Sequence, residues 1–148
     1  FSRIMSLKDG TKKMSKSEPS DLSRINLTDD KDIIINKIKK AKTDPLPLPS
    51  STNELNERPE AKNLLGIYSS LTNTTLDKSI NEFDGKNFSE FKEKLSQVLV
   101  EKINPICLEI KKLTNDKGFL DKILLEGQKK ANNISSNKVK KMHEIIGF

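Results

Sequence analysis

The chain has 148 residues, which is long enough for one domain with a hydrophobic core and too short for two large domains. Hydrophobic residues make up 33% of it and recur at helical spacing, which excludes a chain that is disordered throughout. A single cysteine excludes an intramolecular disulfide, and no stretch approaches the roughly 20 apolar residues of a membrane span. We therefore expect a soluble, cytoplasmic protein with no membrane contact.

The net charge of +6 comes from the two ends of the chain. Residues 1–17 hold five basic side chains against one acidic side chain, and residues 111–148 hold nine lysines against four acids. Residues 18–110 are slightly acidic, with 13 basic and 16 acidic groups. Two separate anion-facing regions are one interpretation, and lysines that merely keep the surface solvated are the other.

The first element in chain order is a short apolar run, "RIMSL" at residues 3–7, which the turn sequence "KDG" follows. This pattern is typical of the end of a β-strand. A lone strand is not stable in water, so we expect that its partner strands belong to a missing part of a longer protein. Residues 18–29 are polar and predict a loop.

A first helix is predicted over residues 30–42, where Ile34, Ile38 and Ala41 share one face and Thr28 and Asp29 supply N-cap chemistry. Residues 44–59 contain four prolines and predict an irregular connection. Further helices are predicted by apolar spacing and capping residues. They cover Pro59 to Leu71, Leu76 to Phe83 with a stop at Gly85, Asn87 to Leu113 with a kink at Pro105, 116–131, and 136–146.

This pattern predicts an all-α fold: a bundle of five or six helices, preceded by a short strand end and a loop. We divide the chain at residue 29, with the strand end and loop in residues 1–29 and the helical domain in residues 30–148. His143, the only histidine, has no visible catalytic partner and is interpreted as an ordinary helical side chain. Cys107 stands between two apolar residues and is interpreted as a small buried hydrophobe.

The loop "KKMSKS" at residues 12–17 is the stretch with the clearest chemistry. Lys13 and Lys16 can both project toward one phosphate chain, and Ser15 and Ser17 add hydroxyl donors. Such a loop suits stabilisation of the charge that develops when pyrophosphate leaves an α-phosphate. We expect Met14 to anchor the loop on apolar surface. Composition alone would favour a solvated loop, because lysine and serine are common in such loops.

The order Lys13-Met14-Ser15-Lys16-Ser17 resembles the second catalytic motif of the class I aminoacyl-tRNA synthetases. Together with other stretches, it makes the whole chain similar to the C-terminal part of the bacterial-type tryptophanyl-tRNA synthetases. These stretches are "RIMSL", "KIKKAKTD" at 37–44, "NLLGIY" at 63–68, "FKEKLSQVL" at 91–99, "INPI" at 103–106 and the terminal "EIIGF".

The resemblance implies ATP, accompanied by Mg²⁺, as the ligand of the loop, and no metal site of the chain's own. It implies that Lys13, Ser15, Lys16 and Ser17 contact the triphosphate and that Lys13 and Lys16 are catalytic, with Lys16 the first candidate for transition-state charge. It also implies that Met14 lies close to the nucleotide and that the backbone of Ile4 contacts the adenine ring.

For the longer protein the resemblance implies ATP-dependent activation of tryptophan, transfer to tRNA(Trp), and a homodimer. The helices that follow the loop are similar to the family's anticodon-binding domain. The "HIGH"-type motif, the Rossmann-type sheet and the tryptophan pocket are not in these 148 residues, so we expect this chain alone to be inactive.

Three questions stay open at the level of sequence. Tyrosyl-tRNA synthetase shares the architecture, although Met14 and Ser15 favour the tryptophan enzyme. A helical RNA-binding or interaction module without catalysis is the alternative outside the enzymes. The C-terminal lysines either face the tRNA backbone or are only solvated; they are Lys129, Lys130, Lys138, Lys140 and Lys141.

Overall fold

The computed structural model describes residues 3–147, so the first residues of the predicted segment 1–29 and the last residue of "EIIGF" lie outside it. Its residues form two compact units, divided after Leu108. Five α-helices and two short 3-10 helices lie in the described part, which contains no named strand. The predicted all-α fold is confirmed, and the division at residue 29 stays a prediction.

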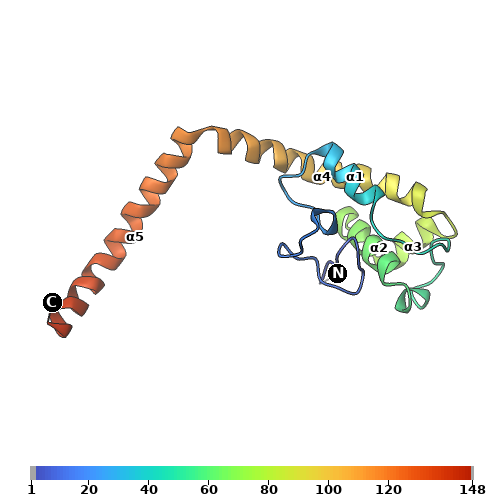
Figure 1. Ribbon diagram of the computed structural model, residues 1–148, viewed down its shortest axis with the longest axis horizontal. Helices are drawn as coiled ribbons and strands as arrows, with labels where there is room; N and C mark the ends of the chain where they lie inside the picture. The colour runs from blue at the N-terminus through green and yellow to red at the C-terminus, as the bar shows by residue number, and fades with distance from the viewer. Residues whose placement is uncertain (1–2, 148) are drawn as a thin grey trace. The chain divides into compact units, whose positions relative to one another are not determined.

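Four helices belong wholly or partly to the first unit (Figure 1). Their bounds are α1 Lys31–Lys39, α2 Pro59–Thr72, α3 Leu76–Phe83 and the part of α4 (Phe88–Asn115) that precedes residue 109. Thr75 caps α3 and Asn87 caps α4, because their side-chain oxygens accept from Lys78 N–H and Glu90 N–H. The two 3-10 helices are η1 Asp21–Ser23 and η2 Glu54–Asn56.

The start of α1 corrects the sequence prediction. Asp30, and not Thr28 or Asp29, is the N-cap, since its carboxylate accepts from the backbone N–H of Ile33 at 3.1 Å. The helix also ends at Lys39 rather than near residue 42. Beyond this end, the ammonium of Lys92 donates to the carbonyl oxygens of Lys39 and Ala41, which α1 leaves without helical partners. Figure 1 shows α1 beside α4.

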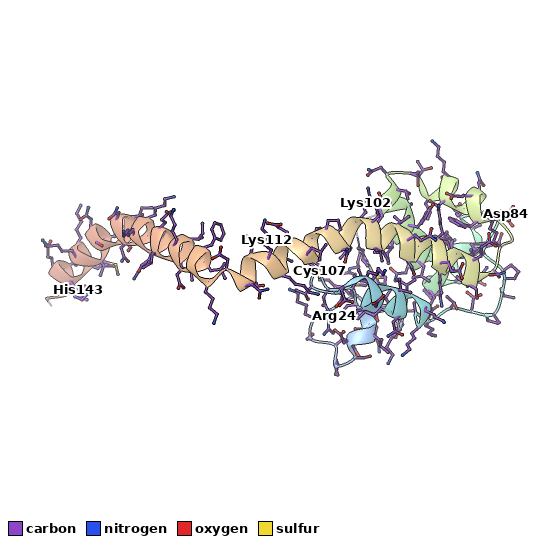
Figure 2. The ribbon with its side chains drawn as sticks, turned by 90° about the horizontal axis from the view of Figure 1, so that it is seen from above. Arg24, Asp84, Lys102, Cys107, Lys112 and His143 are labelled. Carbon is purple, nitrogen blue, oxygen red and sulfur yellow. The ribbon has the colours of Figure 1, made fainter. Side chains whose placement is uncertain are left out.

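The core of the first unit is built from the predicted apolar faces. The buried side chains of its four helices include Ile34, Ile38, Ala61, Leu64, Leu65, Tyr68, Ile80, Phe83, Phe91, Leu95 and Leu99. The rings of Tyr68, Phe83 and Phe91 pack edge to face with centroids 4.8–5.9 Å apart. Cys107 on α4 (Figure 2) is fully buried, as predicted, and its thiol donates to the carbonyl of Thr28.

The irregular connection between α1 and α2 is held by one guanidinium. Arg58 donates to both carboxylate oxygens of Asp44, at 2.7 and 3.0 Å, and lies over the ring of Phe88. The prolines prevent a helix here, so this bidentate pair and the buried side chains of Leu48 and Leu55 replace regular structure.

The second unit contains the last turns of α4 and the helix α5, Lys117–Ile146. The sequence predicted two helices, 116–131 and 136–146, and the structure has one. No proline or glycine stands between them, and the hydroxyls of Ser135 and Ser136 donate back to carbonyls one turn earlier instead of ending the helix. Asp116 caps α5, and no residue of α5 is buried, including the apolar positions predicted for a bundle core.

Pro105 stands inside α4 and does not end it. Proline has no N–H, so one carbonyl of the preceding turn has no helical donor.

Among residues 3–147, no helix is long and apolar enough to cross a membrane.

Candidate nucleotide-binding loop and its cavity

A small hairpin-like turn carries the lysine-rich loop. Met5 and Lys13 form an isolated antiparallel bridge in place of the predicted strand end. The backbone N–H of Met14 donates to the Ile4 carbonyl at 3.2 Å, and that of Ser6 donates to the Lys12 carbonyl at 2.8 Å. The chain reverses at Asp9, whose carboxylate accepts from the hydroxyl and the N–H of Thr11, so these bonds, with the nearby Lys12, lower the pKa of Asp9 below its usual range.

An asparagine of α2 takes the place of a neighbouring strand beside this turn. Asn63 accepts from the N–H of Met5 and donates to its carbonyl oxygen, both at 2.8 Å, which is how a backbone amide would pair in a sheet. The N–H of Leu7 donates to Ser23, and its carbonyl accepts from the N–H of Lys42. The segment is thus fixed by side-chain and loop partners although no second strand is present among the described residues.

Gly10 allows the turn to touch the start of α2. A Cβ at this position would lie 2.5 Å from the backbone carbonyl carbon of Pro59, closer than atoms can approach. Next to it, Glu60 forms an ion pair with Lys42 at 2.8 Å. Burial raises the pKa of Glu60, but hydrogen bonds from Lys42, from its own backbone and from Gly10 outweigh burial and lower it. The hairpin and α2 therefore form one supported corner.

The loop itself follows at residues 13–17. Met14 is half-buried and packs against the hydrophobic core, as predicted. The hydroxyls of Ser15 and Ser17 lie 2.8 Å apart, and the Ser17 N–H donates to Ser15 Oγ. The side chains of Lys13 and Lys16 are exposed. The loop is thus anchored through Met14 while its cations remain accessible.

Most of the predicted site residues line one open cavity of about 970 Å³. Its loop side is formed by Ile4, Lys13, Met14, Ser15 and Lys16; Ser17 is not part of the lining, and its hydroxyl lies beside that of Ser15. The remaining lining residues are Arg3, Arg24, Ile25, Asn26, Leu27 and Thr28. The lining contains four cations and no carboxylate, and its volume is in the range of small-molecule sites. Such a cavity suits a polyanionic ligand with an apolar part.

The wall opposite the loop, residues 24–28, rests on a network of charges that the sequence did not reveal. Arg24 (Figure 2) forms an ion pair with Asp21 at 3.0 Å. Lys37 of α1 lies between Asp21 and Asp29, with its Nζ 2.7 and 2.6 Å from their oxygens. The hydrogen bonds from Lys37 and Asn26 are the strongest influences on Asp21 and lower the pKa of its carboxyl group.

Sequence reasoning found the loop but missed its supports. The sequence predicts N-cap chemistry for Asp29, and the structure places it instead in the buried pair with Lys37. Gly10 is expected from the sequence only as part of a turn, and nothing in the sequence assigns Asn63 or Lys37 a supporting contact, since single asparagines and lysines are common in helices. Only the spatial pairing of Lys37 with residues eight and sixteen positions earlier identifies it.

Two other sequence expectations concern side chains outside this cavity. The lysines of α5 are exposed, and at 100° per residue Lys129, Lys130, Lys138, Lys140 and Lys141 all lie within one half of the helix circumference. They share one side of α5, which fits both a tRNA-facing and a merely solvated surface. In the described part of the chain, no three His, Cys, Asp or Glu side chains are grouped so that they could hold a metal ion.

Known protein families and individual relatives match most of this chain in sequence. A family profile described as class I tRNA synthetases (W and Y) matches residues 1–104. Tryptophan–tRNA ligase of Agrobacterium fabrum is 51% identical over 146 residues, and that of Rhizobium meliloti is 49% identical over the same length. Each match covers 99% of this chain and 41% of the relative, so the chain spans less than half the length of these proteins.

A solved structure supports the fold. The crystal structure of tryptophanyl-tRNA synthetase from Mycoplasma pneumoniae superposes with a TM-score of 0.69 at 24% identity and covers 99% of this chain and 44% of the other. At that identity the likeness concerns the fold alone. The sequence profile carries the assignment because it matches more than half of the residues, and the chain therefore belongs to the class I tRNA synthetases of the tryptophan and tyrosine family.

Proposed function

We propose that this chain is the loop-bearing and helical part of a tryptophan–tRNA ligase, which activates tryptophan with ATP and transfers it to tRNA(Trp). The observation that carries the proposal is the cavity in which Lys13 and Lys16 stand with Ile4, Met14 and Ser15. The names of the relatives, each matched over 99% of this chain, support tryptophan as the amino acid.

In this proposal the loop binds the triphosphate of ATP. Lys13 and Lys16 supply the positive charge, and the hydroxyls of Ser15 and Ser17 donate to phosphate oxygens. Lys16 acts mainly on the charge that accumulates as pyrophosphate leaves, so it raises kcat more than it tightens ground-state binding. The backbone of Ile4 contacts the adenine ring, and Met14 lies close to the nucleotide.

Mg²⁺ fits this site as a companion of the nucleotide. The cavity lining offers hydroxyl and amide groups but no carboxylate. Magnesium ions in proteins are usually held by one or two carboxylates together with the phosphates of a substrate. The phosphate oxygens of ATP would therefore be its principal ligands. The lysines of this chain neutralise the phosphate charge that the metal leaves uncompensated.

The partners follow from the same assignment. The helices after the loop contact tRNA(Trp), the complete protein is a homodimer, and it works in the cytoplasm. The 148 residues alone do not activate tryptophan, because the amino-acid pocket lies elsewhere in the longer protein.

The test is tryptophan-dependent exchange of pyrophosphate into ATP by the full-length protein, with tyrosine as the competing amino acid. We expect Lys16→Ala to lower kcat about 100-fold to 1,000-fold, as the loss of one transition-state donor does. Lys12→Ala is the matched control, since Lys12 is 75% exposed, pairs with Asp9 and does not line the cavity.

Three results would count against the proposal. Exchange that depends on tyrosine would transfer the assignment to the tyrosine enzyme. No exchange with either amino acid would favour a non-catalytic RNA-binding module. Equal loss of activity in the Lys12 and Lys16 variants would mean that the loop contributes only general charge.

A further inference from the structure

A lysine with almost no solvent contact stands behind the cavity wall. The side chain of Lys37 is 2% exposed, and its ammonium group contacts Asp29, itself 7% exposed, and Asp21. Burying such a group costs free energy that its ion pairs only partly offset, and an apolar side chain would often stabilise the fold equally well. Stability alone therefore does not account for a buried lysine at this position.

The two carboxylates that Lys37 holds both orient Asn26 in the cavity wall. Asp29 accepts from the Asn26 N–H at 2.8 Å and from its side-chain amide at 3.3 Å. Asp21 accepts from the same amide at 3.0 Å. Lys37 thus fixes the wall that faces the loop lysines without touching the cavity itself.

A second branch runs from Asp21 to the end of the catalytic loop. Asp21 pairs with Arg24, whose guanidinium donates to the carbonyl of Glu18 at 2.9 Å. Glu18 directly follows Ser17, so this bond holds the C-terminal end of the loop. The N-terminal end is held separately by Asn63 through Met5. The loop is therefore fixed at two ends by two independent supports.

We propose that Lys37 is a positioning residue for nucleotide activation: by holding Asp21 and Asp29 it sets both the C-terminal end of the loop, through Arg24, and the facing wall, through Asn26. This inference rests on the proposed function for its effect on ATP. Its structural half, the ordering of residues 18–29 by Lys37, is independent of that function.

The test compares Lys37→Met and Asp21→Asn with Lys92→Met in the full-length protein. Lys92 is the matched control because it also holds α1 through hydrogen bonds, to the Lys39 and Ala41 carbonyls, but does not contact the cavity network. Asp21 is 57% exposed, so Asp21→Asn keeps the fold even where Lys37→Met does not.

Two readouts are measured for each variant. The first is kcat/KM for ATP in pyrophosphate exchange, per active site, beside the KM for tryptophan. We expect a loss of about 100-fold for Lys37→Met and about 10-fold for Asp21→Asn with the tryptophan KM unchanged, the size that misplacement of a catalytic group produces. The second is amide hydrogen exchange of residues 15–29, which should accelerate in both variants and not in Lys92→Met.

The outcomes separate the two proposals. Unchanged hydrogen exchange in residues 15–29 of Asp21→Asn, or a loss of ATP kcat/KM in Lys92→Met as large as in Lys37→Met, overturns the positioning role. A wild-type protein that is inactive with tryptophan overturns the proposed function, while the hydrogen-exchange comparison still decides whether Lys37 orders the loop.

Discussion

The two units of this chain use their apolar residues in opposite ways. In the first unit, Phe91 and Leu95 of α4 are fully buried among side chains from three other helices. In the second unit, Ile134 and Ile145 of α5 are 73% and 83% exposed, and α5 buries no residue. Both units show helical apolar spacing, so the spacing alone indicates a helix and not a core.

The helices of the two units are stabilised by different interactions. The helices of the first unit are supported by burial and by tertiary bonds such as those of Asn63 and Lys37. The helix α5 relies on its own backbone hydrogen bonds, its Asp116 cap and its length. We expect the first unit to unfold cooperatively and α5 to unfold at a lower denaturant concentration.

The largest predicted difference in the free energy of unfolding is between two leucine-to-alanine variants, one in each unit. Leu95→Ala should destabilise the first unit by about 2–5 kcal/mol, because it opens a cavity in a packed core. Leu124→Ala, at a side chain that is 68% exposed, should change stability by no more than about 0.5 kcal/mol. Urea unfolding followed by Tyr68 fluorescence measures the first unit, since the chain has one tyrosine and no tryptophan, and circular dichroism at the same urea concentrations includes the helical signal of α5. Equal shifts in the two variants would contradict the contrast.

A pair of glycine substitutions should have opposite signs. Gly10→Ala should destabilise the first unit by about 1–3 kcal/mol, since the new Cβ would overlap the backbone of Pro59. Gly127→Ala should stabilise α5 by up to about 1 kcal/mol, because nothing lies within 4 Å and alanine favours the helix. Circular dichroism during thermal unfolding measures both, and a stabilising Gly10→Ala would refute the close approach.

Alkaline titration should distinguish the first unit through its only tyrosine. Burial, with a hydrogen bond to Glu82, raises the pKa of Tyr68 to about 12 from 10.0. The unfolded chain loses this proton near its ordinary pKa while the folded unit keeps it, so stability is full below pH 10 and falls as the pH rises toward 12. Near-ultraviolet absorbance should show one phenolate transition near pH 12, and Tyr68→Phe should remove this part of the stability loss. A transition near pH 10 in the folded protein would contradict the buried environment.

The smallest predicted effect concerns the lysines of α5. If the helices contact tRNA as proposed, replacing Lys138, Lys140 and Lys141 by alanine should weaken binding of a tRNA(Trp) anticodon stem-loop a few-fold and reduce the salt dependence of the binding constant, because lysines that reach phosphates bind by charge alone. Fluorescence anisotropy at two salt concentrations measures both, with an altered anticodon as control. A selective loss for the cognate anticodon would instead show that these lysines take part in base reading.

Much of the first unit could be predicted from the chain because its signals are local. Apolar spacing predicted the buried faces of α1 and α2, α4 is capped by Asn87 where the sequence placed its start, and Met14 packs on the core as expected. Errors arose where neighbouring residues compete for one role. Asp29 and Asp30 are chemically alike, and only the position of the Lys37 ammonium assigns one to the ion pair and the other to the cap.

By itself, the sequence determined the helical periodicity, the family resemblance and the composition of the loop at residues 13–17. These are properties of residue order, which spacing along the chain records. The tertiary structure alone decided that Lys13 and Lys16 share a cavity with Arg24 and Asn26, that Asn63 substitutes for a strand, and that α5 is one helix without a buried face. Contacts between residues 8 to 58 positions apart depend on how the helices pack, and no local pattern encodes them.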